Sequence, residues 1–501
     1  MSVSSERKST ANIAARTHAH TSALPTDRLE HTSAWGMAAA ALNYVYRPST
    51  LEQLRDVFAL ARATGRPVGM RGGGQSYGDA ALNGGHILLN LNRMKLILAW
   101  DPESGSITVE PGVTIQQLWR YVLGDGWWLP VAPGTGFPTL GGCASMNIHG
   151  KNNWRAGPLG NHILEFTALL ATGEELYCSR DENADLFFAF IGGLGLLGCF
   201  TSITLQLKRV YSGRYKVRVR PARNIEEMVD LLEAHKDIHE YMVGWSDGLA
   251  RDSALGRGEI HFADYLAPGE DPQPDQSLRL ENQDLPDSLF GIVPKSIIWM
   301  FMLTVMNNLG TKLVNFAKYR MAQFKGEHTY EQPFAAFNFL LDYVPNWKKA
   351  YQPGGLIQYQ SFIPRENAAR TFRVLMEHSR RAGLPTYLGV VKRHRPDDFL
   401  LTHAVDGYSL AMDFQVTQRK RERLARLARE MDEIVLAAGG RFYFAKDSTL
   451  RPEVAAAYLG EETLAKFNAL KQRCDPQNLL QTNLSRRVFP GLGENDSPEQ
   501  H

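Results

Sequence analysis

Apolar residues in the N-terminal part of the chain recur first at helical spacing and then in short strand-like runs. Between Ser49 and Gly65 they return every three or four positions, which predicts a helix that a Ser49–Glu52 capping box begins and Gly65 ends. A second capping box at Thr114 predicts another helix, ending near Gly124. Short apolar runs predict strands at 67–70, 87–91, 106–110 and 200–207. These elements predict an α+β domain.

From about Gly213 the patterns become longer and mixed. A polar, acidic, proline-containing stretch at 270–287 predicts a mobile loop. Strands are predicted at 356–363, 387–391 and 408–416, a charged helix at 418–438, and a strand carrying Lys446 at 441–448. Because 501 residues exceed what one core supports, we expect two domains. The expected order is a disordered segment 1–29, a first domain 30–212 with a C-terminal return 440–490, a second domain 213–439, and a disordered tail 491–501.

Composition places the chain among ordinary soluble globular proteins, with 44% apolar and 22% charged residues. A formal charge of +2 gives no reason to expect nucleic acid as a partner. The four cysteines are widely scattered and fit neither a disulfide framework nor a metal site, so no metal is expected. The first 28 residues show no apolar core of a secretory signal. A reducing, cytoplasmic location is expected.

The segment 296–306 is the most apolar run of the chain. Its eleven residues fall short of the roughly 20 that span a bilayer. Length favours a buried helix of the second domain. The alternative is a segment that lies at the inner face of a membrane, making the protein peripheral, and the neighbouring cations support it. These cations are Lys295, Lys312, Lys318, Arg320 and Lys325.

Two glycine-rich runs carry the first chemical signal. One spans 70–79 (MRGGGQSYGD) and the other spans 133–150, from Pro133-Gly134-Thr135-Gly136 to His149-Gly150. Successive glycines let backbone N–H groups point to one place, which forms a nest for an anion such as a pyrophosphate. Two such runs predict a dinucleotide held from both sides.

A third glycine motif, Gly193-Leu-Gly195-Leu-Leu-Gly198, matches the Rossmann fingerprint in letters only. That fingerprint needs a strand before it and a helix after it. Here a helix-like segment precedes, a strand-like segment follows, and no acid stands about 20 residues on. The reversed order argues against a nicotinamide site.

Further motifs run from Trp35-Gly36 to the C-terminus: Gln75-Ser-Tyr-Gly-Asp79, Ile148-His-Gly-Lys-Asn152, Gly157-x-x-Gly160-Asn161-His162, Gln358-Tyr-Gln360 and Tyr443-x-Ala-Lys446-Asp447-Ser448. With the glycine runs they resemble the vanillyl-alcohol oxidase superfamily. The resemblance implies an α+β, two-domain PCMH-type FAD-binding fold with a mixed-sheet substrate (cap) domain. Members with covalent flavin often carry histidine where this chain has Gln75, and glutamine cannot form that bond. Non-covalent FAD is therefore expected.

The resemblance also implies which residues contact the cofactor. They come from both glycine runs, from the strand after the third motif and from the last motif. The expected cofactor-binding residues are Arg71, Gly72, Gly73, Gly74, Gln75, Ser76, Tyr77, Gly78, Gly134, Thr139, Gly141, Gly142, Asn147, His149, Phe200 and Tyr443.

His149 and Lys446 are the expected catalytic residues. Oxidising a carbinol requires hydride removal from carbon and proton removal from oxygen. His149 is interpreted as a proton acceptor or polar positioner, against the alternative of a structural histidine. By resemblance Lys446 faces flavin and substrate hydroxyl, where its charge would stabilise an alkoxide. The alternative is a surface lysine beside Asp447.

Four residues are expected to bind the substrate. Gln358 and Gln360 alternate on one strand and so share a face, as sugar-binding amides would. Lys392 matches a substrate-site lysine and Lys151 lies in the HGKN motif, and two cations suit a phosphodiester-linked sugar. The chain departs from the family pattern at Asn338, His394, Ser409 and Ala411.

The expected function is FAD-dependent oxidation of a secondary hydroxyl of a sugar or polyol, such as a polyprenyl-phosphate-linked pentose, to a ketone by hydride transfer to flavin N5. A separate reductase would complete an epimerisation. Three alternatives remain open: a flavin-dependent alkene reductase of the sterol type, a soluble polyol oxidase that uses oxygen, and a non-catalytic flavin- or lipid-binding protein.

Overall fold

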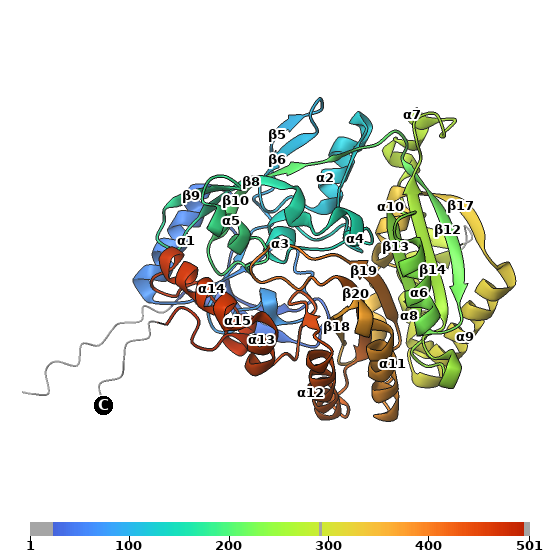
Figure 1. The fold of residues 1–501 in the computed structure, drawn as a ribbon. Coiled ribbons are helices and arrows are strands. Elements are labelled where there is room, and N and C mark those ends of the chain that lie inside the picture. Colours follow the sequence, from blue (N-terminus) through green and yellow to red (C-terminus); the bar gives the residue numbers. More distant parts are fainter. Residues whose placement is uncertain (1–23, 290–292, 495–501) are drawn as a thin grey trace, which may run out of the picture.

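The computed structural model describes residues 24–289 and 293–494, and Figure 1 shows their arrangement. The predictions for residues 1–23 and 495–501 lie outside the described residues. Order begins before residue 30, because Leu24 is buried and a 3-10 helix spans Thr26–Arg28. The two-domain α+β fold expected from the sequence is confirmed.

The first sheet is mixed, in the order β1-β2-β4-β3. Strands β2, β4 and β3 are parallel, whereas β1 is antiparallel to β2. Helix α1 (Leu51–Thr64) joins β2 to β3 and ends at Gly65, as predicted. Its N-cap is Thr50, which accepts the N–H of Gln53, so the capping box predicted at Ser49 is one residue out of register. The strands are β1 (Leu29–Ser33), β2 (Ala40–Tyr46), β3 (Val68–Arg71) and β4 (Ile87–Asn90).

The second sheet is antiparallel, in the order β5-β6-β10-β8-β9. Helix α2 (Ile115–Val122) carries the predicted capping box at Thr114. Helix α5 precedes the third glycine motif and β10 follows it, which confirms the reversed order. The elements are β5 (Ile97–Asp101), β6 (Ser106–Val109), β7 (Trp127–Trp128), α3 (Leu140–Ser145), α4 (Asn153–Ala156), β8 (Ile163–Leu169), β9 (Glu175–Ser179), α5 (Ala184–Phe190), β10 (Cys199–Gln206) and β11 (Lys208–Arg209).

An eight-stranded sheet forms the core of the second half, in the order β17-β12-β14-β13-β19-β20-β18-β21. Every pairing in it is antiparallel, so the mixed sheet lies in the first half of the molecule and not in the substrate domain. Helices α6, α11 and α12 cover one face (Figure 1). The elements are β12 (Arg214–Ala222), α6 (Ile225–His235), β13 (Tyr241–Ser246), β14 (Gly258–Tyr265), β17 (His328–Pro333), α10 (Phe334–Asn338), β18 (Leu356–Pro364), α11 (Arg365–Arg381), β19 (Gly389–His394), β20 (Gly407–Gln415), α12 (Arg421–Ala437) and β21 (Arg441–Phe442).

Two expectations for the second half need correction. The strand predicted at 441–448 ends at Phe442, and Lys446 lies in the turn that follows, where its N–H donates to Tyr443 O. The stretch 270–287 is anchored rather than free. It contains α7 (Pro274–Ser277), and the buried Gln283 side chain donates to Gly213 O at 2.8 Å.

The C-terminal helices return to the first sheet, as Figure 1 shows where their red ribbon lies beside the blue elements. Backbone N–H of Val68 donates to Leu479 O, and N–H of Gln481 donates to Val68 O. Residues more than 400 positions apart along the chain are thereby joined. The helices are α13 (Pro452–Leu459), α14 (Glu461–Cys474) and α15 (Asn483–Val488).

A bent pair of helices stands on the outer side of the second half (Figure 1). The 3-10 turn Lys295–Ile297 leads into α8 (Ile298–Val305), and α9 (Asn308–Lys325) follows. The chain bends by 116° between the segment Lys295–Val305 and α9. None of the α8 residues is buried, so the interpretation of 296–306 as a buried helix is wrong. In the described residues no single helix is both long and apolar enough to cross a bilayer, and only this bent pair, taken together, meets that criterion. The short strands β15 (Ser288–Leu289) and β16 (Val293–Pro294) precede it.

Candidate active site

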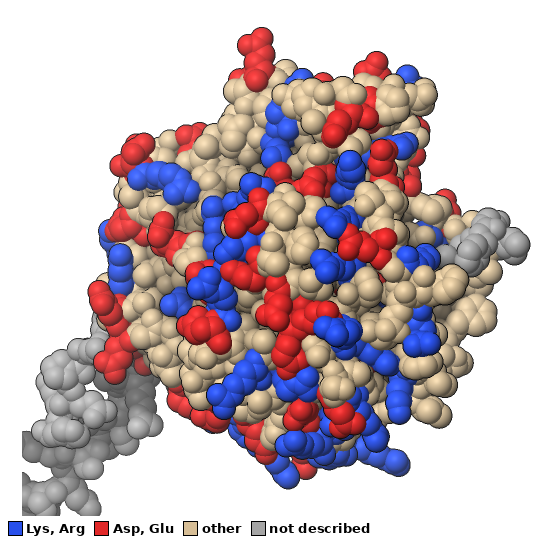
Figure 2. Space-filling model, turned by 45° about the vertical axis from the view of Figure 1, so that its right-hand side comes forward, with Lys and Arg blue, Asp and Glu red and all other residues tan. Residues whose placement is uncertain are grey.

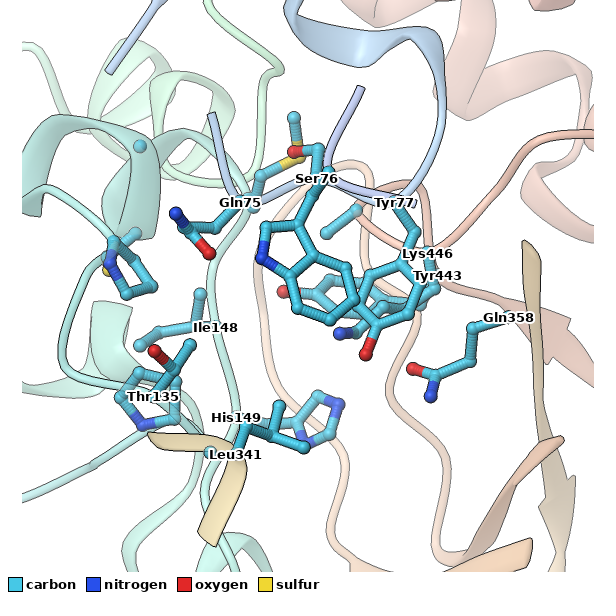
Figure 3. Close-up of a pocket in the computed structure, with 18 of the residues that line it drawn as sticks. Gln75, Ser76, Tyr77, Thr135, Ile148, His149, Leu341, Gln358, Tyr443 and Lys446 are labelled. Carbon is cyan, nitrogen blue, oxygen red and sulfur yellow. The ribbon is translucent and has the colours of Figure 1, made fainter. Parts of the chain in front are cut away.

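A cavity of about 530 Å³ lies between the glycine runs and the eight-stranded sheet. This volume is typical of cavities that enclose small molecules. Both glycine runs line it, together with residues of β13, β18, β19 and β20 and of the turn after β21. Figure 3 shows Tyr77, Tyr443 and Lys446 grouped on one side of this cavity, with His149 and Gln358 facing the same space.

The two glycine runs press against each other. A Cβ on Gly72 would lie 1.9 Å from Thr139 Oγ1, and one on Gly73 would lie 2.4 Å from Phe137 O. Glycine is required here by contact between the runs. No backbone N–H of residues 72–76 donates to another group of the described chain, and the buried Thr139 hydroxyl has no partner there either. Unpaired donors of this kind suit a pyrophosphate, so the site fits the expected FAD.

Most of the predicted cofactor-binding residues line the cavity, but three do not. The Arg71 guanidinium donates to Ser33 O and Ala81 O, beneath Gly74. Gly78 faces the turn after β21, where a Cβ would lie 1.8 Å from Asp447 O. Asn147 adopts φ 42° and accepts the Gly160 N–H. These three residues shape the loops and do not face the cavity. The lining residues are Gly72, Gly73, Gly74, Gln75, Ser76, Tyr77, Gly134, Thr139, Gly141, Gly142, His149, Phe200 and Tyr443.

Arg487 on α15 positions the turn that carries Lys446. Its guanidinium bonds Asp79, after the first glycine run, at 2.7 Å and Asp447 at 2.8 Å. The N–H of Tyr77 donates to Ala445 O at 3.0 Å. Lys446 is therefore not a surface partner of Asp447. The first glycine run and the C-terminal helix hold it at the cavity.

The Lys446 ammonium lies 3.8 Å from the centroid of the Tyr77 ring. Burial and the nearby charge of Lys392 lower the pKa of Lys446 to about 7, although the Asp413 carboxylate opposes this. With a pKa of about 7, Lys446 is present in both its neutral and its protonated form at neutral pH.

Asp413, on β20, was missed by the sequence analysis. It is fully buried, accepts from Gln358 Nε2 at 2.6 Å, and its other oxygen has no partner among the described groups. Burial raises the pKa of Asp413 to about 6. The signal for it was present, since Ser409, Ala411 and Asp413 alternate along a strand and so share the face that meets Gln358 and Gln360.

A chain of hydrogen bonds connects His149 to β19 and β20. Gln360 Nε2 lies 3.2 Å from His149 Nε2 and 3.4 Å from Ser409 Oγ. Ser409 Oγ lies 2.7 Å from His394 Nε2, and His394 Nδ1 lies 3.0 Å from Asn153 Oδ1. Two of the positions that depart from the family pattern, His394 and Ser409, are thus direct neighbours in one network.

The direction of the hydrogen bonds in this network follows from one backbone N–H group. The N–H of Arg395 donates to Asn153 Oδ1 at 3.4 Å, which identifies that atom as the acceptor. His394 must then donate from Nδ1 and accept at Nε2 from the Ser409 hydroxyl. Gln360 donates to both Ser409 and His149, so the proton of neutral His149 is on Nδ1. That atom is buried and has no partner among the described residues.

Burial keeps this histidine neutral. Desolvation, reinforced by the charge of Lys392, lowers the pKa of His149 well below its ordinary value. Desolvation likewise lowers the pKa of His394. A neutral imidazole whose pKa is lowered this far is a weak proton acceptor, which favours the polar-positioner role.

The two predicted phosphate-binding lysines differ. Lys392 lines the cavity, and burial lowers its pKa to about 8, so it is mainly charged at neutral pH. Lys151 also lines the cavity, but its ammonium donates to Phe337 O and lies 4.3 Å from the Phe337 ring centroid. Burial lowers its pKa strongly. Because the Lys151 ammonium already contacts Phe337, Lys392 is the better ligand for an anion.

Comparison with known proteins agrees with this site. Residues 42–179 match the family described as FAD binding domain. The chain is 28% identical to decaprenylphosphoryl-beta-D-ribose oxidase of Mycolicibacterium smegmatis, over 91% of this chain and 96% of the relative. It is 29% identical to L-gulonolactone oxidase of Mus musculus over 39% of this chain and 43% of the relative. It is 28% identical to D-arabinono-1,4-lactone oxidase of Yarrowia lipolytica, over 33% of this chain and 32% of the relative. The chain is therefore an FAD-dependent oxidoreductase with a PCMH-type FAD-binding domain, and it is similar to oxidases of the vanillyl-alcohol oxidase superfamily.

Proposed function

We propose that this protein oxidises a secondary hydroxyl of a sugar to a ketone, and that the sugar is a pentose joined through phosphate to a polyprenyl chain. The observation that carries the proposal is the cavity itself, where a titratable lysine, a neutral histidine and two amides adjoin the glycine runs. The names of the three relatives, each an oxidase of a sugar or sugar lactone, support the substrate class.

The reaction removes two electrons with one hydrogen from the carbinol carbon, and one proton from its oxygen. Bound FAD would supply the hydride acceptor at its N5 atom. Lys446 in its neutral form accepts the hydroxyl proton. The resulting ammonium is stabilised by the carboxylate of Asp413, whose charge favours the protonated form of Lys446.

The remaining groups position the substrate. The imidazole of His149, which Gln360 holds through Nε2, forms part of the cavity wall against which the sugar is positioned. The Gln358 side chain, fixed by Asp413, extends toward the same space (Figure 3). Lys392 provides a cation for the phosphate. Asn338 and Ala411, which differ from the family pattern, also line the cavity and so bear on which pentose it accepts.

The test is anaerobic reduction of the purified holoenzyme. Adding a polyprenyl-phosphate-linked pentose should bleach the oxidised flavin spectrum and yield the keto sugar in equal amount. A matched free pentose serves as the control for the phosphate. Reduction by a nicotinamide, with no response to any sugar, would instead identify an alkene reductase. Rapid peroxide release with a free polyol would identify a soluble polyol oxidase. A flavin that no substrate reduces would identify a non-catalytic binding protein.

Two partners follow from the proposed reaction. A ketone product can be returned as the epimeric alcohol only by a separate reductase. The reduced cofactor must also pass its electrons to an oxidant before the next turnover.

A further inference from the structure

Helix α9 buries polar groups against the protein and exposes large apolar side chains, together with cations, on its outward face. The buried positions of this helix are Thr311, Asn315, Tyr319 and Ala322. Asn315 even donates to the buried Asp247 at 3.0 Å. Several large apolar side chains of the helix are exposed, with Phe324 at 93%, Leu309 at 68% and Leu313 at 60% exposure. A helix on the surface of a globular protein normally has the opposite arrangement.

Helix α8 extends the same surface. Met300, Phe301 and Leu303 are exposed, and Phe301 reaches 63%. Scattered apolar residues are ordinary on a protein surface, but a continuous patch over two helices marks a binding surface. We name this patch the α8–α9 surface. It consists of Met300, Phe301, Leu303, Leu309, Leu313, Val314, Phe316, Met321 and Phe324.

The charge around this surface has one sign. No acidic residue occurs between Asp287 and Glu327, although the whole chain has a formal charge of only +2. Figure 2 brings the right-hand elements of Figure 1 forward, and the right side of that view is largely tan, with blue and some red side chains. The cations in this interval are Lys295, Lys312, Lys318, Arg320 and Lys325. Lys295 is buried and Lys318 pairs with Glu259, so Lys312, Arg320 and Lys325 are the exposed cations available to anionic headgroups. Apolar side chains among cations complement a bilayer with anionic headgroups.

The α8–α9 surface is connected to the active-site cavity. Lys318 belongs to α9 and also lines the cavity, where its ammonium lies 3.9 Å from the Trp245 ring centroid and 3.0 Å from Glu259. Trp245, Tyr330 and Gln332 line the same end. The cavity thus runs from the glycine runs to the helix that carries the apolar patch.

We propose that the α8–α9 surface docks on an anionic membrane and places the outer end of the cavity at the lipid surface. The 116° bend suits two helices lying in the interface better than a span. This inference extends the proposed function, because a polyprenyl-linked sugar could then enter the cavity while its hydrocarbon chain stays in the bilayer. The docking itself requires no substrate, and so it can be tested separately.

The test is co-sedimentation of the holoenzyme with vesicles of phosphatidylcholine alone or mixed with phosphatidylglycerol. The wild type should bind the mixed vesicles. The triple variant Leu313→Ser, Phe316→Ser, Phe324→Ser should bind at least about tenfold more weakly. Each of Lys312→Glu and Lys325→Glu should weaken binding roughly fivefold or more, with loss of the preference for anionic vesicles. The matched control Leu96→Ser, Leu98→Ser, Ile238→Ser changes equally exposed residues elsewhere and should leave binding unchanged.

A second measurement covers variants that fold poorly. Trp299 on α8 should be quenched by brominated lipid in the wild type, and Trp299→Phe should remove that quenching. Retained flavin absorbance shows that each variant is folded. Equal vesicle binding by the wild type and the triple variant overturns the proposal. The proposal is also overturned if the wild type does not bind vesicles but associates with itself, and the triple variant abolishes that self-association. The surface would then be an interface between copies of this chain.

The outcome is independent of the substrate assignment. If vesicles bind but no polyprenyl-linked sugar reduces the flavin, the docking stands and the proposed function fails. If the sugar reduces the flavin and vesicles do not bind, the proposed function stands and the docking fails.

Discussion

Gln360 Nε2 lies 3.2 Å from His149 Nε2, although the two residues come from different halves of the molecule. Gln360 is on β18 of the eight-stranded sheet, and His149 is in the second glycine run. This single contact ties the second glycine run to the eight-stranded sheet. Because the amide donates, it also decides which nitrogen of the histidine carries the proton.

Breaking the network should change the tautomer of His149. His394→Phe removes the acceptor of the Ser409 hydroxyl, and Ser409→Ala removes the hydroxyl itself. We expect kcat to fall roughly tenfold in each variant, because the histidine loses its fixed orientation. Nitrogen-15 NMR of histidine-labelled holoenzyme, with His149→Gln used for assignment, should show Nδ1–H in the wild type and a mixture in both variants.

His403→Phe is the matched control for that experiment. This buried histidine packs 5.6 Å from the His149 ring centroid but makes no hydrogen bond in the network. Its loss should leave the His149 signals unchanged. An Nε2–H form of His149 in the wild type would refute the direction of the hydrogen bonds assigned to the network.

Activity should depend on the neutral form of Lys446. Its pKa is lowered to about 7, so kcat should rise as pH increases through that value and the amine loses its proton. Lys446→Met should reduce kcat by about 10²–10⁴-fold, because the proton acceptor is lost. Flavin absorbance and substrate affinity should change little. A kcat in the variant that matches the wild type would exclude this role.

Asp413→Asn should move that pH profile to lower pH. The carboxylate raises the pKa of Lys446, so its removal lets the lysine lose its proton more readily. The rising limb of kcat should therefore shift toward acid, while the geometry at Gln358 is kept by the amide. A shift toward alkali, or none, would show that the two groups are not coupled.

Replacing Gly72 by alanine should weaken FAD binding at least about tenfold, because the new methyl group forces the glycine runs apart. The ideal Cβ position is 1.9 Å from Thr139 Oγ1. Gly124→Ala is the matched control, since a Cβ there meets nothing within 4 Å. Flavin fluorescence during dilution measures both. Equal dissociation constants for the two variants would argue against the role assigned to the contact.

The flavin should leave the protein on acid precipitation. Gln75 lies in the first glycine run, where its side chain donates to Gly73 O at 2.9 Å and has no chemistry for a covalent bond to the cofactor. All yellow colour is expected in the supernatant. Colour that stays with the precipitated protein would show a covalent bond made elsewhere.

Much of the framework could be predicted from the sequence because it is encoded locally. The capping box at Thr114 and the glycine stop at Gly65 both form as predicted. The order of helix and strand around the third glycine motif is enough to exclude a Rossmann site, and that order is legible from local patterns alone. The alternation of Gln358 and Gln360 correctly predicted a shared face, because side chains on a strand alternate whatever the strand pairs with.

The active-site side chains are brought together by contacts between segments that are distant in the sequence. Asp413 becomes part of the site only because β20 pairs with β18 and places Asp413 opposite Gln358. The turn carrying Lys446 is fixed by Arg487, and burial there, which no local pattern reports, brings its pKa down to about 7. Likewise the sequence determined that 296–306 is apolar, but only the tertiary structure decided that this segment lies at the surface, where none of the α8 residues is buried. Periodicity is a property of neighbouring residues, whereas burial and charge coupling arise from which surfaces the folded chain brings together.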